Sequence, residues 1–186
     1  MNRYFLTDTE TTGLLKDGNP DFLAQPGIVQ IAAVVLDENF VEIDFINTKV
    51  NPEIAAAAWE KKAIETHHIE PSMVEDAPTF FALLPDYARL ATGATHWVGY
   101  NNAFDKKVLF HQLMRYGFET NFPWPFQNID VMRLASNRMS MEGKRGTKNP
   151  KLSEIYEFLF PMKTFGAHDA LEDCRATAEV LRELSK

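Results

Sequence analysis

The pattern of apolar and polar positions predicts five short strands. Residues 28–36 form a nearly continuous run of β-branched residues and alanine, which is typical of a strand buried on both faces. Residues 40–50 alternate apolar and polar side chains, as in a strand with one face in water. Shorter runs predict strands at residues 4–7, 96–100 and 129–131. The first three strands along the chain therefore form a meander.

Helical patterns occupy most of the remaining chain. Helices are expected at residues 54–66, 104–116, 132–139, 152–160 and 169–184, and a further one begins at Pro78 and is interrupted or shifted at Pro85. Gly117 should end the helix before it, and Pro161 should do the same. This order of elements predicts an α/β chain with a mixed sheet. Its 186 residues suit a single domain, residues 1–186, with excursions near residues 15–27 and 140–150.

Composition narrows the classes of protein that need to be considered. No apolar run approaches the roughly 20 residues that cross a bilayer, and Asp8 comes too early for a signal peptide, so no membrane partner is expected. Cys174 is the one cysteine, which excludes an intrachain disulfide and fits a cytoplasmic location. The net charge of −7 opposes nucleic-acid binding only weakly, because bound metal ions reverse the local charge of carboxylates.

Two acids, Asp8 and Glu10, directly follow the first predicted strand. Side chains two residues apart on a strand share a face and lie roughly 7 Å apart, so the two carboxylates repel each other. A divalent cation is the usual compensation. The alternative is a strand that simply runs out into solvent, because such pairs are common on protein surfaces.

Two further acids fall on the apolar sides of predicted helices. Asp173 lies in line with Val180 and Leu184 on the last helix, and Asp105 shares a face with Leu109. A charge that faces the core needs a partner or a metal ion. The alternatives are a buried salt bridge or helix-end interaction for Asp173 and N-terminal capping for Asp105.

His168 immediately precedes the last predicted helix. Histidine titrates near neutrality, which suits a proton acceptor, although isolated histidines are more often structural or exposed. The four acids and His168 can converge on one cleft, where four carboxylates can hold two hard cations roughly 3.5–4 Å apart. One ion would activate a water and the other would stabilise a leaving 3′ oxygen, while the histidine takes the proton from the water.

Three segments resemble known motifs. They read Thr-Asp-Thr-Glu-Thr-Thr-Gly-Leu at residues 7–14, Val-Gly-Tyr-Asn-Asn-Ala-Phe-Asp at residues 98–105 and Ala-His-Asp-Ala-Leu-Glu-Asp at residues 167–173. In order and spacing they resemble the DEDDh 3′-to-5′ exonucleases, relatives of the proofreading epsilon subunit of bacterial replicative polymerases. The likeness runs from about residue 4 to residue 184. It implies a ribonuclease-H-like fold, with a mixed five-stranded sheet flanked by helices.

The resemblance also implies roles for individual residues. It makes two divalent cations, Mg²⁺ or Mn²⁺, the cofactors, with His168 as the general base. The implied metal ligands are Asp8, Glu10, Asp105 and Asp173. The implied substrate contacts are the Thr11 backbone at the terminal 3′-OH, Leu14 as an apolar wedge against the last base, His67, Asn101 and Phe104.

Two positions near the motifs have structural alternatives. His67 aligns with a His-Gly-Ile motif in which His68 replaces the glycine, so the turn is expected to differ. The two histidines could instead end a helix near its negative pole. Asp130, at the end of a strand, is expected near the cleft as a supporting residue or a helix cap.

The expected activity is 3′-to-5′ hydrolysis of phosphodiester bonds at the end of DNA, preferentially single-stranded, with or without a polymerase or replication partner. RNA trimming with the same ions is the alternative, because no residue shows a contact to a 2′-OH. A non-catalytic nucleic-acid-binding relative is a further alternative, against which the five filled catalytic positions argue. Lys144, Arg145 and Lys148 predict either a clamp on phosphates or a solvated turn.

Overall fold

Five strands form one mixed sheet at the centre of the molecule. The computed structural model describes residues 1–16, 18–19, 21–141 and 149–186. The strands are β1 (Tyr4–Thr11), β2 (Ile28–Leu36), β3 (Glu42–Lys49), β4 (His96–Gly99) and β5 (Gln127–Asp130). Their order in the sheet is β3-β2-β1-β4-β5, in which β2 pairs antiparallel with β1 and β3, and β4 pairs parallel with β1 and β5. The predicted five-stranded α/β arrangement is confirmed.

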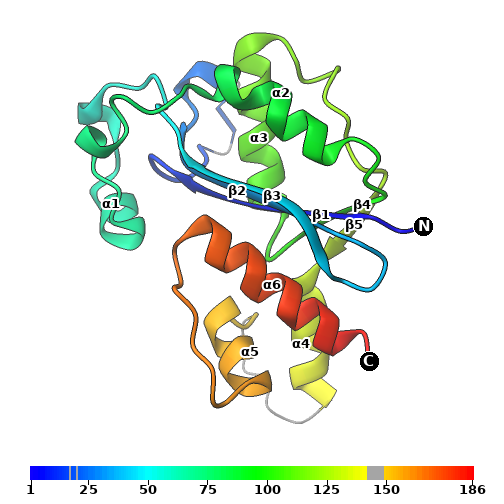
Figure 1. Cartoon of the computed structure of the whole chain (residues 1–186). Coiled ribbons are helices and arrows are strands. Elements are labelled where there is room, and N and C mark those ends of the chain that lie inside the picture. Colours follow the sequence, from blue (N-terminus) through cyan, green and yellow to red (C-terminus); the bar gives the residue numbers. More distant parts are fainter. Residues whose placement is uncertain (17, 20, 142–148) are drawn as a thin grey trace.

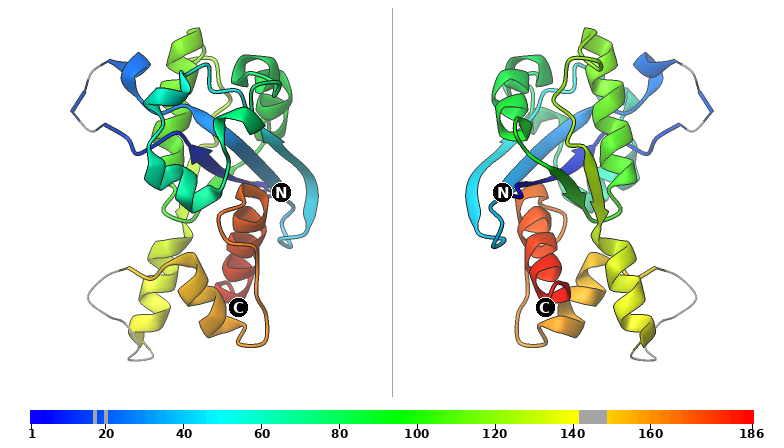
Figure 2. Two further views of the ribbon diagram at one scale, coloured as in Figure 1. Left: turned by 90° about the vertical axis from the view of Figure 1, so that its left-hand side faces the viewer. Right: turned by 90° about the vertical axis from the view of Figure 1, so that its right-hand side faces the viewer.

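Helices cover both faces of this sheet. The helices are α1 (Lys61–His67), α2 (Phe80–Ala91), α3 (Ala103–Tyr116), α4 (Val131–Met141), α5 (Leu152–Leu159) and α6 (Ala170–Leu184), with short 3₁₀ turns η1 (Phe22–Ala24), η2 (Ala56–Ala58) and η3 (Pro71–Met73). One face carries α2 and α3, and the other carries α6 with α4 and α5 beside it (Figure 1). The two side views in Figure 2 show the same separation. No helix in the described part of the chain is long and apolar enough to cross a membrane.

The alternation of side chains along the central strands creates a separate core on each face. On β2, Ile31 and Val35 pack under α2 and α3, whereas Ala32 and Val34 pack against α6. All residues of β2 are buried, as expected for a strand covered on both faces. On β1, Leu6 belongs to the core under α6. The same alternation decides which face of the sheet receives the polar residues that follow on β1.

The helix predicted at residues 54–66 is wrong in its first half. The alanines form only the turn η2, and the α-helix begins at Lys61. Trp59 ends the turn, because its side chain is buried in a small core with Val29 and Ile69. The next residue, Glu60, donates its backbone N–H to the carbonyl of Thr12 at a distance of 2.8 Å. These tertiary contacts outweigh the helix propensity of alanine.

Pro85 does not interrupt its helix. The helix α2 begins after Thr79, whose side-chain oxygen accepts the N–H of Ala82, and continues through Pro85 to Ala91. A proline inside a helix removes one hydrogen bond, but the buried apolar side of α2, which includes Tyr87 and Leu90, holds the helix on the sheet. The start expected at Pro78 lies two residues before the observed one.

The structure describes the first expected excursion except for residues 17 and 20, whereas it leaves out residues 142–148 of the second. In the first, η1 is capped by Asp21, and the backbone carbonyl of Gln25 accepts a hydrogen bond of 2.5 Å from Arg115 of α3. The Gln25 side chain bonds both the N–H and the carbonyl of Lys16, so this stretch is anchored to itself and to α3. The basic residues of the second excursion, Lys144, Arg145 and Lys148, lie outside the described residues.

Candidate active site

Asp8 and Glu10 lie within β1 itself, because the strand continues to Thr11 instead of ending at Thr7. They follow Leu6 in the alternation and therefore point to the face of the sheet that α6 covers. The register between β1 and β2 shifts directly after Glu10, which pairs with Gln30, whereas Thr11 pairs with Ile28. Such a bulge bends the strand and redirects the side chains beyond it. The strand β1 is therefore bent directly after Glu10, next to the two acids.

Asp105 reaches the same end of β1 from the first turn of α3. It is buried, and its Oδ1 accepts hydrogen bonds of 3.0 Å from the backbone N–H of Thr9 and 2.8 Å from the Thr9 hydroxyl. Two donors on one oxygen fix the rotamer of Asp105 and join α3 to β1. Asp105 therefore lies beside Thr9, the residue between Asp8 and Glu10, although it comes from a helix on the other face of the sheet.

Asp173 and His168 are positioned by the start of α6. Asp169 caps this helix, because its Oδ1 accepts the N–H groups of Leu171 and Glu172 at 3.1 and 3.2 Å. The backbone N–H of His168 donates to Oδ2 of Asp173 at 3.1 Å. His168 has a left-handed backbone, with φ of 70°, and is exposed. The turn before α6 therefore folds back so that His168 lies beside the carboxylate of Asp173.

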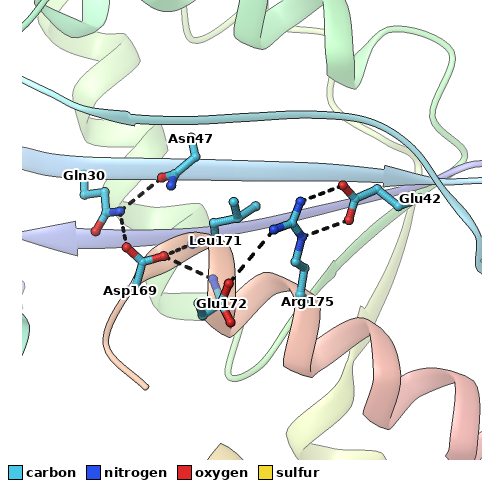
Figure 3. A network of polar contacts seen from close by, with 7 residues as sticks. All are labelled: Gln30, Glu42, Asn47, Asp169, Leu171, Glu172 and Arg175. Atoms are coloured by element: carbon cyan, nitrogen blue, oxygen red, sulfur yellow. Dashed lines mark hydrogen bonds and ion pairs between the residues drawn. The ribbon is translucent and has the colours of Figure 1, made fainter. Parts of the chain in front are cut away.

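A polar network holds the start of α6 against the sheet (Figure 3). Gln30 of β2 donates from Nε2 to Oδ2 of Asp169 at 2.9 Å and to Oδ1 of Asn47 at 3.1 Å. One turn further along α6, Arg175 forms two hydrogen bonds, of 3.1 and 2.9 Å, with the carboxylate of Glu42. The second contact is exposed, whereas Gln30 is buried. The end of α6 that carries the site is thus attached to the sheet through Gln30.

The acids converge with His168 at one edge of the sheet. Ligand atoms of Glu10, His168 and Asp173 all lie within 4.8 Å of one another, an arrangement that could hold a metal ion. Asp8 and Asp105 lie close enough to these groups to perturb one another electrostatically. In Figure 1 the end of β1, the beginning of α6 and α1 lie on the same side of the molecule. The structure therefore brings together all five residues predicted to be catalytic.

Burial and mutual repulsion raise the pKa of every carboxyl group in this cluster. For Asp8 the pKa lies well above its ordinary value, because of burial first and the negative charges of Asp105 and Asp173 next. Burial likewise raises the pKa of Glu10 to about 8, that of Asp105 to about 7 against the hydrogen bonds from Thr9, and that of Asp173 to about 6. Such a set of oxygen donors fits hard divalent cations, which compensate the repulsion.

His67 joins α1 to the end of β1. Its Nδ1 accepts the N–H of Ile69 at 3.0 Å, so the proton resides on Nε2, which donates to the carbonyl of Thr11 at 3.2 Å. Burial lowers the pKa of His67 and favours this neutral form. His68 ends the helix with a left-handed backbone, φ of 58°, which is the conformation that glycine adopts most easily. His67 thus lies in the last turn of α1, as the structural alternative expects, and bonds the end of β1, whereas its contact with substrate stays a prediction.

Four of the five predicted substrate contacts line a cavity of about 250 Å³ beside the acids. These are Thr11, Leu14, His67 and Phe104, and Glu10 lines the same cavity. Asn101 is not among its described lining residues. It is exposed, has a φ of 57°, and donates its backbone N–H to Asp130 at 3.1 Å. The same oxygen of Asp130 accepts the N–H of Met132 at 3.0 Å, which confirms the expected helix cap.

Several residues of the site were not predicted, and three of them have specific contacts there. Thr9 orients Asp105, Gln30 holds Asp169, and Glu60 lines the cavity opposite Gly13. A Cβ atom added to Gly13 would come within 2.5 Å of the Glu60 side chain, so a larger residue at this position would require the exposed Glu60 side chain to move. Gln30 had a visible signal, because it is the one polar residue in the apolar run at residues 28–36. Glu60 had none, because its position depends on the unexpected path of η2.

Known protein sequences match this chain over most of its length. The family model RNase_T, described as an exonuclease family, matches residues 5–181. A PolC-type DNA polymerase III of Caldanaerobacter subterraneus subsp. tengcongensis is 29% identical over 177 residues, which make up 95% of this chain but only 11% of that polymerase. The chain thus spans about a tenth of the length of this curated relative.

Solved exonuclease structures superpose over nearly the whole chain. Exonuclease X in complex with 5′ overhanging duplex DNA is 25% identical, with a TM-score of 0.66 over 97% of this chain and 90% of that one. Exonuclease I of E. coli in complex with a dT13 oligonucleotide has a TM-score of 0.76 over 100% of this chain and 41% of that one, at 20% identity. These likenesses confirm the ribonuclease-H-like fold expected from the motifs.

Proposed function

Because the chain belongs to the RNase_T exonuclease family, whose model matches residues 5–181, we propose that it removes nucleotides from the 3′ end of DNA, preferentially from single strands. Family membership makes it a nuclease that hydrolyses phosphodiester bonds. The observation that carries the finer proposal is the convergence of four carboxylates from β1, α3 and α6 with His168. We treat residues 1–186 as one exonuclease domain.

Divalent cations belong to the chemistry of this family, and the proposal assigns two, Mg²⁺ or Mn²⁺. Asp8, Glu10, Asp105 and Asp173 would hold them, since their raised pKa values reflect a repulsion that cations relieve. When bound, such ions activate a water and stabilise the leaving 3′ oxygen. The chain's own contribution is to fix the carboxylates, through Thr9 for Asp105 and through the α6 cap for Asp173.

His168 is the proposed proton acceptor. Its exposed position and its closeness to Glu10 and Asp173 allow its ring to reach a water at the carboxylate cluster. Its backbone is tied to Asp173, so the ring stays near the acids even though it precedes the helix. A histidine in this place can take a proton near neutral pH and release it to solvent.

The cavity beside the acids is the proposed site of the terminal nucleotide. Leu14 is 66% exposed, which leaves its side chain available as a wedge against the last base. Phe104 lines the same cavity and offers a ring for stacking. His67 bonds the carbonyl of Thr11 and fixes the end of β1, which supports the proposed contact between the Thr11 backbone and the 3′-OH. Asn101 remains a proposed contact from the rim.

Digestion of matched, 5′-labelled DNA and RNA oligonucleotides with Mg²⁺ or Mn²⁺ tests the proposal. We expect a ladder of shortened, still labelled DNA strands, and no ladder in excess chelator or with Asp8→Asn. Release of the 5′ label as a mononucleotide at the start of digestion, without labelled intermediates, would overturn the polarity. Faster shortening of RNA would overturn DNA as the substrate. Digestion in excess chelator would overturn the metal mechanism, and no digestion at all would favour a non-catalytic binding role.

The likeness to a PolC-type polymerase supports a polymerase or other replication protein as the proposed partner. This relative is a polymerase, so we propose that a polymerase supplies the strand to be corrected. We expect a mismatched 3′ end to be removed faster than a matched one when a replicative polymerase is present. Equal rates of removal for the two ends would favour an exonuclease that acts without a polymerase partner.

A further inference from the structure

The cavity at the acids continues along the outside of α3. A second cavity, of about 300 Å³, shares Leu14 and Phe104 with the first and adds Leu15, Ala103 and Lys107. A third, of about 510 Å³, shares Ala103 and Lys107 with the second and adds Lys106, Phe110 and Trp124. The shared residues make one continuous path that leaves the acid cluster and follows the first two turns of α3.

The far part of this path combines positive charge with aromatic rings. Lys107 and Phe110 are exposed, and 42% of the surface of Phe110 is accessible. The ammonium group of Lys106 lies 5.6 Å from the centre of a Trp124 ring. Trp124 is held in place because its Nε1 donates to the carbonyl of Glu119 at 3.1 Å. The side chains of Lys106, Lys107, Phe110 and Trp124 form a surface of positive charges and aromatic rings, which we call the α3 groove.

We propose that the α3 groove binds the nucleotides on the 5′ side of the terminal nucleotide in a single DNA strand. This inference rests on the proposed function. Lys106 and Lys107 would contact the phosphates, and the rings of Phe110 and Trp124 would stack with bases. Every base has a face that can stack, so the groove would hold a strand without regard to its sequence.

Charge complementarity supports a nucleic-acid strand as the occupant. The whole chain carries a net charge of −7, yet none of the described residues that line the second and third cavities is acidic. The first cavity, by contrast, is lined by Glu10 and Glu60. Two lysines on a predominantly acidic protein thus lie together on a path that continues from the carboxylates, and a polyanion is attracted there.

The length of the groove sets the number of nucleotides. Phe104 and Phe110 are six residues apart on α3, a distance of about 9 Å along the helix axis. Successive nucleotides of a stacked strand rise by about 3.4 Å, so the groove spans roughly two to three nucleotides beyond the terminal one. Stacking requires unpaired bases, because paired bases already stack within a duplex. The groove therefore favours a single-stranded 3′ end.

Kinetics on strands of different length test the proposal. The variants are the pair Lys106→Ala with Lys107→Ala, and Phe110→Ala alone. We expect the KM for an eight-nucleotide oligothymidylate to rise about 5- to 20-fold in each, since one stacked base or a few phosphate contacts are lost. A dinucleotide places only one nucleotide beyond the terminal one, so its KM should rise much less than that of the longer strand, and its kcat should stay unchanged.

Matched controls lie elsewhere on the surface. Lys49→Ala with Lys186→Ala removes two exposed lysines, and Phe81→Ala removes an aromatic side chain that is 53% exposed on α2. These variants should keep the KM of the parent for both strands. Thermal unfolding of every variant checks that the fold is retained, so a KM change that accompanies an unchanged melting temperature belongs to the groove.

Equilibrium binding separates this proposal from the proposed activity. The affinity for a dye-labelled oligothymidylate, measured in chelator, requires no turnover. The double lysine variant should weaken this affinity and flatten its dependence on salt by about 0.7 units of slope for each lost phosphate contact. If the parent protein proved inactive but these differences in affinity remained, the proposed exonuclease activity would be contradicted and the proposed α3 groove would stand. Groove variants that bind and turn over the long strand like the parent would overturn the groove.

Discussion

His68 shows how one backbone angle constrains the site. It ends α1 with a φ of 58°, directly after His67, which bonds the end of β1. A left-handed backbone costs a residue with a Cβ atom roughly 1–2 kcal/mol, whereas glycine adopts it freely but loses more entropy on folding. The turn therefore keeps the geometry of a glycine position although a histidine occupies it, at some cost to stability.

His68→Gly should stabilise the protein by about 0.5–1 kcal/mol, which corresponds to a rise of roughly 1–4 °C in melting temperature for a chain of this size. Thermal unfolding measures the change. Glu65→Gly, at an exposed position within the same helix, is the matched control and should lower stability by about 0.5–1 kcal/mol. A destabilised His68→Gly would mean that the imidazole itself contributes contacts that outweigh the backbone strain.

Replacement of His168 by alanine tests the proposed proton acceptor. Because the four carboxylates remain, His168→Ala should still bind metal ions and the DNA strand, while turnover falls roughly 10²–10⁴-fold. Single-turnover cleavage at saturating Mn²⁺ measures the loss, and a melting temperature that rises with added Mn²⁺ shows that metal binding persists. Equal single-turnover rates for the variant and the parent would remove His168 from the mechanism.

Asp105 and Asp173 could be singled out from sequence because each places a charge on an apolar helix face, whereas Asp8, Glu10 and His168 were identified with the help of the three motifs. Asp173 and Asp105 interrupt apolar helix faces, and the structure places both at the cluster. Their supporting contacts were less visible. Thr9 is an ordinary residue for a strand, and only the packing of α3 against β1 reveals that it holds Asp105.

At the scale of elements, the site depends on how α6 is attached to the sheet. Gln30 contacts Asp169 at the first turn of α6, and Arg175 contacts Glu42 one turn later. The first contact is next in sequence to His168, whereas the second supports the middle of the helix (Figure 3). Loss of the Gln30 contact should therefore affect the reaction, whereas loss of the Arg175 contact should not.

Gln30→Ala should lower kcat by roughly 10-fold or more and leave KM within about a factor of two, because a shift of the α6 start displaces His168 and Asp173 without touching the nucleotide cavity. Arg175→Ala is the matched control, since exposed ion pairs contribute about 1 kcal/mol or less, and its kcat should stay near that of the parent. Steady-state kinetics measures both variants. Equal kcat values for Gln30→Ala and the parent would show that the α6 cap holds without the glutamine.

The boundaries of elements were predictable where local signals and packing agree. Gly117 ends α3 with a φ of 71°, and β2 has the predicted bounds. The prediction failed at residues 54–66, where a buried Trp59 and the bond from Glu60 to Thr12 divide an alanine-rich stretch. These contacts join segments that are far apart in sequence, so no local pattern could have indicated them.

At the scale of the whole molecule, the acid cluster opposes folding when no metal ion is bound. Raised pKa values mean that the folded protein holds protons that the unfolded chain has already released. The stability of the metal-free protein should therefore fall as the pH rises from the ordinary carboxyl values, near 4, through the folded-state values of about 6 for Asp173, about 7 for Asp105 and about 8 for Glu10.

We expect the melting temperature in chelator to drop by roughly 5 °C or more between about pH 5.5 and about pH 8.5, and the drop to shrink with saturating Mg²⁺ or Mn²⁺. Differential scanning calorimetry in both conditions measures this. Asp8→Asn removes one charge from the cluster and should raise the melting temperature of the metal-free protein at the higher pH. A marked loss of stability in Asp8→Asn and Asp173→Asn would instead identify these acids as partners in structural ion pairs.

The overall architecture followed from the motifs, whereas the α3 groove did not. In the sequence, Lys106 and Lys107 are two adjacent lysines directly after Asp105 and carry no further signal. Their meaning depends on Trp124, which approaches from the segment before β5 and completes the surface. A helix wheel shows which residues share a face, but it cannot show what a later segment of the chain places beside them.

The distribution of the acids has a consequence for the timing of synthesis. Asp8 lies on the first strand, Asp105 on a helix near the middle and Asp173 on the last helix of the described chain. On a ribosome, the strand with the first two carboxylates is made long before α6, so the cluster is complete only after α6 has emerged. A nascent chain that ends before α6 lacks Asp173 and therefore holds only part of the proposed metal site.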